Sequence, residues 1–304
     1  MARFRYCTAD VFTDAPFGGN QLAVFPDARG IPEHRLLDVA REFNYSESTF
    51  VFPPDDPKHT RRVRIFTPDC EIPFAGHPTV GTAHVLAAIG DVTLTGDSTN
   101  IVLEEGVGPV PVRIVSSNGV PTFCELSVAK LPESIGTPPA RDALARVLSL
   151  EVDDLLDGDW GAEAFSCGLP WLYIALRDID AVRRARVRTD VWEQVFAGTS
   201  PADISVFALG GDRVGSDIHA RVFVPSMSIP EDPATGSAAA ALGGYLGARF
   251  SQADGTRRWR IEQGFEMRRP SILELEVDFA NSAVSGVRVG GGTVLVCEGT
   301  MEIS

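Results

Sequence analysis

The sequence lacks the residues and motifs on which most cofactor chemistry depends. Only two of its 27 basic residues are lysines, Lys58 in a polar turn and Lys130 close to a proline. Neither has the apolar surroundings of a Schiff-base lysine, so we expect no pyridoxal phosphate. The chain also has no G-x-x-x-x-G-K-[ST] motif and no strand-associated G-x-G-x-x-G. The usual nucleotide sites are therefore excluded, and we expect no cofactor.

Cysteine is scarce as well. The five cysteines are scattered, odd in number and never spaced as C-x-x-C. This pattern favours reduced thiols in a cytoplasmic protein over a disulfide or zinc framework. No cluster of histidine, cysteine and carboxylate residues has metal-ligand spacing, so we expect no metal.

Long apolar runs are also missing, and the 41 acidic residues outnumber the 27 basic ones. The N-terminus has no apolar core of signal-peptide length, and no run of about 18 apolar residues predicts a membrane-spanning helix. The formal net charge of −14 repels phosphate backbones, so we expect neither a membrane nor a nucleic-acid partner. One dense arginine cluster, at positions 183, 184, 186 and 188, has no interleaved aromatic residues and is interpreted as a solvated helix end.

The sequence is instead rich in short β-type segments separated by its 29 glycines and 21 prolines. Several alternate polar and apolar residues, which is typical of half-buried antiparallel strands. Examples are Leu22–Phe25, Ser48–Phe52, Arg61–Phe66, Ile204–Leu209 and Ala220–Val224. Amphipathic helices are predicted at Pro32–Phe43, Ala140–Leu148 and Asp190–Phe196.

Two further helices have a different character. Thr79–Ile89 and Thr235–Ala248 contain many small residues and no Asp, Glu, Lys or Arg. A helix that is apolar all round is buried all round. In a chain dominated by short strands, the place for such a helix is inside a curled sheet. The pattern thus predicts an α+β protein with mostly antiparallel, barrel-like sheets around central buried helices.

The two buried helices belong to an internal repeat. Arg64–Gly90 aligns without a gap on Arg221–Gly247, and both segments share the frame Arg-x-Phe-x-Pro-x-x-x-Ile-Pro. We therefore predict two similar domains from a duplication. The first would comprise residues 1–128 together with about 281–304, and the second residues 129–280, with a linker near Ala129–Pro139.

The loops before the buried helices differ between the repeats and are the predicted site of chemistry. The first contains His77, and the second contains Asp232, Thr235 and Ser237. Helix N-termini favour anionic groups, so these loops suit a small carboxylate-bearing ligand. On residue type alone, Asp232 and Thr235 also fit ordinary N-cap residues, and His77 also fits a plain loop histidine.

Glu47 stands out because it opens the apolar segment Ser48–Phe52. Glutamate is a poor strand former. We expect its carboxylate to be partly buried, with a pKa raised toward neutrality, as a general acid/base requires. A surface glutamate is the alternative.

Five motifs together resemble the phenazine-biosynthesis PhzF-like family, in the family's order along nearly the whole chain. Gln21 is a departure, since the family usually has proline after Gly-Asn. The motifs are DVFTDAPFGGNQLAVF (10–25), NYSESTFVF (44–52), RIFTPDCEIPFAGHPTVGTA (64–83), EDPATGSAAAALGGYL (231–246) and QGFEMRRPS (263–271).

The resemblance implies a fold like that of diaminopimelate epimerase, a homodimer, and isomerase chemistry without a cofactor. It implies a function similar to the dihydro-hydroxyanthranilate isomerase of phenazine biosynthesis. The family's catalytic glutamate falls on Glu47, and its substrate-binding histidine, aspartate and serine fall on His77, Asp232 and Ser237. The same motifs make us expect substrate contacts from a further four residues, Asn20, Gly76, Thr235 and Gly236.

Two alternatives remain open at this point. The first is an epimerase of an amino or hydroxy acid, and the second is a metabolite-binding protein without catalysis. Related epimerases use two cysteines, but the loops Phe74–Gly81 and Glu231–Ala238 contain none, and we expect Cys70 to be structural. This disfavours thiol-based racemisation.

Overall fold

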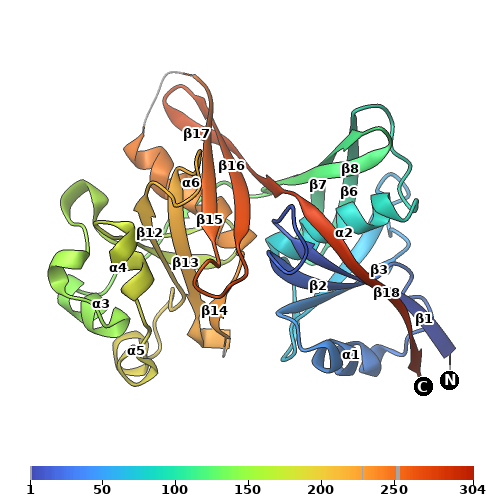
Figure 1. The fold of residues 1–304 in the computed structure, drawn as a ribbon, viewed down its shortest axis with the longest axis horizontal. Helices are drawn as coiled ribbons and strands as arrows, with labels where there is room; N and C mark the ends of the chain where they lie inside the picture. The colour runs from blue at the N-terminus through green and yellow to red at the C-terminus, as the bar shows by residue number, and fades with distance from the viewer. Residues whose placement is uncertain (1, 228, 251–253) are drawn as a thin grey trace. The chain divides into compact units, whose positions relative to one another are not determined.

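A computed structural model describes residues 2–227, 229–250 and 254–304 (Figure 1). The chain divides into two compact units, Met1–Ala129 with Val289–Ser304, and Lys130–Arg288. The chain re-enters the first unit at Val289, later than the expected position near residue 281. The reason is strand β17 (Ala283–Gly291), whose Val284 and Val287 face glycines of the second unit's central helix. Arg288 on the same strand also pairs with Glu276 and Asp278 of that unit.

The first unit is one mixed sheet curled around a helix. The strands follow the order β18–β1–β2–β3–β4–β6–β7–β8, and β5 adds to β4. Only the pairs β2–β3 and β4–β6 among these are parallel. The strands are β1 (Ala2–Val11), β2 (Asn20–Phe25), β3 (Glu47–Phe52), β4 (Arg61–Phe66), β5 (Glu71–Ile72), β6 (Ser98–Glu105), β7 (Gly108–Ser117), β8 (Val120–Ser127) and β18 (Thr293–Ile303).

The second unit repeats this topology. Its order is β9–β10–β11–β12–β13–β15–β16, with β14 on β13, and its parallel pairs are β11–β12 and β13–β15. The strands are β9 (Glu133–Ser134), β10 (Glu163–Ser166), β11 (Pro170–Ala175), β12 (Ile204–Leu209), β13 (Ile218–Val224), β14 (Ile229–Asp232), β15 (Gly255–Gln263) and β16 (Ser271–Ala280). Matching parallel pairs at matching places confirm the predicted α+β fold of two similar halves.

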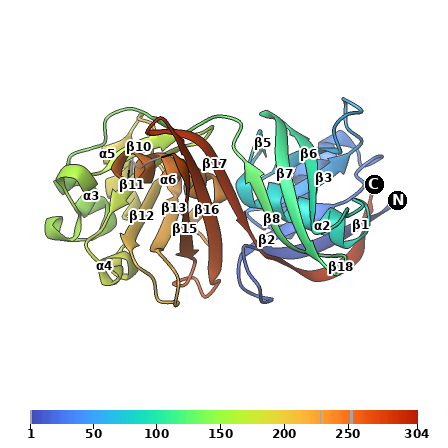
Figure 2. The ribbon, with the colours of Figure 1, turned by 90° about the horizontal axis from the view of Figure 1, so that it is seen from above.

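The two uncharged segments form the central helices α2 (Gly76–Ala88) and α6 (Gly236–Arg249), as predicted. Every residue from Gly76 to Ala87 and from Gly236 to Gly247 is buried. Helix α2 contacts β1, β2, β3, β7, β8 and β18, which surround it in Figure 2. Small residues are needed at these contacts. A Cβ at Gly81 would lie 2.5 Å from a Val11 methyl group, and one at Gly244 would lie 2.6 Å from Pro132 Cβ.

The amphipathic helices lie outside the sheets, and all but α3 lie in the crossovers between parallel strands. Helix α1 (Leu36–Phe43) follows a 3-10 turn, Glu33–Arg35, and packs on Phe25 and Phe50. In the second unit the helices are α3 (Arg141–Leu148), α4 (Ile179–Arg184) and α5 (Thr189–Phe196), with 3-10 turns at Val152–Asp154, Gly158–Trp160 and Pro225–Met227. The arginine cluster begins at the end of α4, as predicted. None of the described helices is both long and apolar enough to cross a membrane.

The repeated Arg-x-Phe frame has the same structural role in both units. Arg64 on β4 pairs with Glu71 on β5, and Arg221 on β13 pairs with Glu231 on β14. Each arginine therefore braces the short strand that leads into the divergent loop. Each guanidinium also lies over the phenylalanine two residues further on, at 5.2 and 4.9 Å from the ring centroid.

The gap-free alignment of the repeats is wrong from the short strands β5 and β14 onward, because Arg64 pairs with Glu71 whereas Arg221 pairs with Glu231. The first intrahelical hydrogen bond runs from Thr79 N to Ala75 O in α2 and from Ala239 N to Thr235 O in α6. The connection from Arg221 to the start of α6 is therefore three residues longer than the connection from Arg64 to the start of α2, while the loops from β5 to α2 and from β14 to α6 each have three residues. This shift makes Gly76 equivalent to Gly236, and His77 equivalent to Ser237.

Candidate active site

Three chain segments bring the predicted site residues of the first unit together. Strand β2 begins at Asn20, and strand β3, its parallel neighbour, begins at Glu47. Asn44 adopts a left-handed conformation (φ 52°) and ends α1, so the chain turns directly into β3. His77 is the second residue of α2. Since all four predicted residues, Gly76 included, lie at element starts, their positions are fixed by the scaffold.

The side chains form a short polar chain. His77 Nε2 lies 3.4 Å from Glu47 Oε2, and His77 Nδ1 lies 3.2 Å from Asn20 Nδ2. The Ser46 hydroxyl donates to Asn20 Oδ1 at 2.9 Å, which turns the amide nitrogen of Asn20 toward the ring. In the tautomer that accepts this amide hydrogen at Nδ1, Nε2 carries the ring proton and faces Glu47.

Burial sets the charge of the histidine. It lowers the pKa of His77 to about 3, against the opposing effect of a hydrogen bond with the Gln21 backbone. His77 is therefore neutral at physiological pH and acts as a hydrogen-bonding group without a charge. The Glu47 side chain keeps 14% of its surface exposed, whereas Oε2, the oxygen nearest His77, is itself buried. The raised pKa expected for Glu47 stays a prediction.

The predicted residues of the second unit form their own group around the start of α6. Asp232 ends β14, Thr235 is the N-cap residue, and Gly236 and Ser237 open the helix. The Thr235 hydroxyl donates a very short hydrogen bond to Asp232 Oδ2. All four residues are buried. Thr235 is therefore the N-cap residue of α6, which was the alternative interpretation of this residue. Its side chain donates a hydrogen bond to Asp232.

One cysteine near this group escaped the sequence analysis. Cys167 Sγ lies 4.0 Å from the carbonyl oxygen of Ser237, although residue 167 is far from the loop in sequence. Burial raises the pKa of the Cys167 thiol to about 12, so the thiolate that a thiol-based racemase needs is absent at neutral pH. Cys70, expected to be structural, is exposed.

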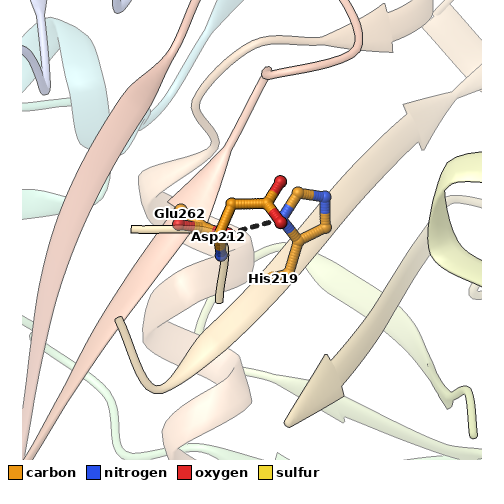
Figure 3. Close-up of side chains that lie close together, drawn as sticks. All are labelled: Asp212, His219 and Glu262. Carbon is orange, nitrogen blue, oxygen red and sulfur yellow. Dashed lines mark hydrogen bonds and ion pairs between the residues drawn. The ribbon is translucent and has the colours of Figure 1, made fainter. Parts of the chain in front are cut away.

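Within the residues that the structure describes, one group has the spacing of metal ligands: Asp212, His219 and Glu262 (Figure 3). Its donor atoms are already used. His219 Nδ1 bonds Glu262 Oε1 at 2.6 Å, and Nε2 bonds Glu266 Oε1 at 2.9 Å. Burial lowers the pKa of His219, but the bonds to Glu266 and Glu262 outweigh it and raise the pKa overall. An imidazolium held between two carboxylates has no lone pair for a metal, so this cluster is structural.

Comparisons with known proteins agree with the fold. Residues 9–299 match the family described as phenazine biosynthesis-like protein. An uncharacterised isomerase of Mesorhizobium japonicum is 38% identical over the whole of both chains. The trans-2,3-dihydro-3-hydroxyanthranilate isomerase of Pseudomonas fluorescens is 33% identical, covering 98% of this chain and 99% of that protein.

Solved structures show the same relationship. The chain superposes on a PhzF family protein of Bacillus anthracis with a TM-score of 0.89 and 25% identity over 100% of both chains. A hydroxyproline epimerase from Agrobacterium vitis shares the fold alone, with a TM-score of 0.65 and 12% identity over 99% of this chain and 91% of that one. The protein belongs to the phenazine biosynthesis-like family and is an isomerase with an epimerase-like fold.

Proposed function

We propose that the protein isomerises a small carboxylate-bearing metabolite by moving one proton, with Glu47 as the general acid/base. The observation that carries this proposal is the placement of Glu47. A glutamate whose side chain is mostly buried but keeps 14% of its surface exposed lies at the start of β3, with Oε2 3.4 Å from a neutral histidine at the start of α2. General acid/base groups need this combination of restricted solvation and access.

In this mechanism the carboxylate of Glu47 removes a proton from carbon, and the resulting carboxylic acid returns it to another carbon on the same face. His77 Nε2–H, 3.4 Å from Glu47 Oε2, would donate to the carboxylate and orient it during the reaction. The first-turn N–H groups of α2, those of Gly76 and His77, would stabilise negative charge that develops on the substrate. Asn20 and Ser46 hold the histidine ring.

Asp232, Thr235, Gly236 and Ser237 would hold polar groups of a bound ligand. Support comes from the pairing of His77 with Ser237 at equivalent helix positions and from the family relationship. The first compound to test is trans-2,3-dihydro-3-hydroxyanthranilate, because relatives over nearly the full chain are named as its isomerases. Membership of a phenazine pathway, a cytoplasmic location and a homodimer stay predictions.

The decisive experiment compares Glu47→Gln with Glu42→Gln, a matched change at an exposed glutamate on α1. Glutamine keeps the shape of Glu47 but cannot take and return a proton. We expect Glu47→Gln to fold and bind substrate while its turnover falls by roughly 100-fold or more. Glu42→Gln should turn over like the parent.

Product formed in D₂O should also carry deuterium at the carbon that receives the proton, as far as the shuttled proton exchanges with water. If Glu47→Gln turns over within a few-fold of the parent, the one-base mechanism is wrong. If the anthranilate compound is not turned over, α-carbon deuterium exchange across a panel of small amino and hydroxy acids tests the epimerase alternative. A protein that binds such compounds and exchanges none of them is a metabolite-binding protein.

A further inference from the structure

The motif QGFEMRRPS (263–271) has no role in the mechanism above, yet it lies against the second loop. Strand β15 ends at Gln263, β16 begins at Ser271, and the turn between them is closed by hydrogen bonds from Met267 N and Arg269 N to Gly264 O. The turn contacts the loop that carries Asp232 in two ways, through a buried side chain and through the backbone.

The side chain is Gln263, only 2% exposed. Its Nε2 donates to the carbonyl oxygen of Asp232 at 2.8 Å and to the Thr235 hydroxyl at 3.1 Å. Its Oε1 accepts from the backbone N–H of Thr235 at 3.2 Å. One amide group therefore ties down both ends of the segment from Asp232 to Thr235.

These bonds also fix the direction of the threonine hydroxyl. Because Thr235 Oγ1 accepts from Gln263 Nε2, its own proton is free to point at Asp232 Oδ2, to which it donates. The chain of donors runs from Gln263 through Thr235 to Asp232. It favours the ionised carboxylate of Asp232 in one orientation.

The backbone contact depends on Gly264. This residue has φ +76°, and a Cβ there would lie 2.5 Å from the carbonyl oxygens of Pro233 and Arg269. Beyond it, Glu266 bonds His219, and Arg221 from the same strand as His219 pairs with Glu231, the neighbour of Asp232. The turn after Gln263 is therefore bonded to β13, the strand whose Arg221 pairs with the residue before Asp232.

The repeat shows that an amide is not required by the fold at this position. The register of the parallel pairs sets Arg62 opposite Glu104 and His219 opposite Glu262, so Glu105 is the counterpart of Gln263. Glu105 also approaches the first turn of its central helix, where Oε1 accepts from the Thr79 hydroxyl. The first unit uses a carboxyl group at this place, whereas the second uses a group that donates as well as accepts.

We propose that Gln263 is a positioning residue, which holds the Asp232 carboxylate and the Thr235 hydroxyl in the orientation that binds substrate. This inference rests on the proposed function, in which Asp232 holds the ligand. It assigns a role to the amide itself: its donated hydrogens, and not only its bulk, set the geometry of the loop.

The test exchanges the amide for groups of similar size. Gln263→Leu removes both the donor and the acceptor, and Gln263→Glu keeps the acceptor but donates only while the introduced carboxyl is protonated. Gln194→Glu, at an exposed position on α5, is the matched control. Kinetics with the substrate of the parent protein are measured from pH 5 to 9, alongside thermal unfolding.

We expect Gln263→Leu to raise KM about tenfold or more at every pH, with a smaller change in kcat, as the loss of three hydrogen bonds in the loop implies. Gln263→Glu should approach the parent KM at low pH and the Gln263→Leu value at high pH. Its apparent pKa should exceed that of an exposed glutamate because the site is buried. Gln194→Glu should follow the parent.

Amide hydrogen exchange gives a readout that does not depend on turnover. Peptides covering residues 231–238 should lose protection in Gln263→Leu, and in Gln263→Glu at high pH, while peptides covering 73–79 should not change. KM values within twofold of the parent at all pH values would overturn the inference and leave the proposed function intact. If the parent itself has no turnover, the proposed function fails, and unchanged exchange in 231–238 would then overturn the positioning role as well.

Discussion

Glu105 makes the stability of the protein depend on pH in a way that can be calculated. The residue ends β6 with its side chain toward α2, and Thr79 donates to its Oε1 at 2.7 Å. Burial raises the pKa of Glu105 from 4.5 to about 8, although the hydrogen bond from Thr79 lowers it in part. The group is therefore a carboxylic acid in the folded protein at pH 7 and a carboxylate in the unfolded chain.

Folding at pH 7 must consequently take up a proton. The cost is absent below the unfolded pKa, grows as the pH rises from about 4.5, and stops growing once the pH passes the folded pKa of about 8. At pH 7 the difference from the unfolded pKa is about 2.5 units, which corresponds to about 3 kcal/mol. Glutamine at this position keeps the acceptor for Thr79 and removes the titration.

The assay is urea unfolding of the parent and Glu105→Gln at half-unit steps from pH 4.5 to 9. We expect the stability of the variant relative to the parent to increase by about 3 kcal/mol between pH 4.5 and 7, then to level off above pH 8. Other titrating groups cancel in this difference because both proteins contain them.

The adjacent Glu104 is a control of opposite sign. Backbone N–H groups of Asp55 and Asp56 lower the pKa of Glu104 to about 2, with a smaller contribution from His59. Its carboxylate stabilises the fold above pH 4.5, and that contribution is lost as the pH falls toward 2. Glu104→Gln should thus be less stable than the parent at pH 7, with the difference shrinking in acid. Parallel curves for the parent and Glu105→Gln across the whole range would refute the buried-acid interpretation.

Two further predictions address the cysteines and the central helix. Alkylation with iodoacetamide should modify the exposed Cys70 and Cys297 in the folded protein and leave turnover within about twofold, because the buried Cys167 is a poor nucleophile. Loss of activity that tracks modification of one cysteine would contradict this. Ala240→Asp should destabilise the protein by about 4 kcal/mol or more, since position 240 is only 1% exposed. Ala248→Asp, at the exposed end of α6, should cost far less in thermal or urea unfolding, and equal effects would show that α6 is not enclosed.

The elements that sequence predicted best are those whose pattern has a single physical interpretation. A helix without charged residues has no face suited to solvent. The sequence therefore predicted both the presence of α2 and α6 and their burial inside the sheets. Strands β4 and β12 match their predicted limits because they combine alternation with clear ends. Strand β1 was missed because Arg3 and Arg5 interrupt its apolar pattern, yet each pairs with a glutamate across β18.

The candidate site was predictable only in part. Glu47 and His77 could be proposed from motifs, and the structure brings them to 3.4 Å. The roles of Ser46 and Gln263 could not be predicted from the sequence. Their residue types do not indicate which group they bond, and their partners are far away in sequence. The three-residue insertion before α6 was hidden because small residues align with small residues at any offset.

The two units show how one scaffold came to support different chemistry at neighbouring positions. Glu104 and Glu262 occupy the same register position, and each accepts two consecutive backbone N–H groups and one histidine ring. This shared arrangement ties the end of the central parallel strand pair to the loop before it. One residue further on the units diverge, into a buried acid at Glu105 and an amide donor at Gln263. At the second residue of the central helix they diverge again, into His77 and Ser237. Under the proposed function, this divergence gives the first unit the group that transfers the proton and the second unit groups that hold a ligand.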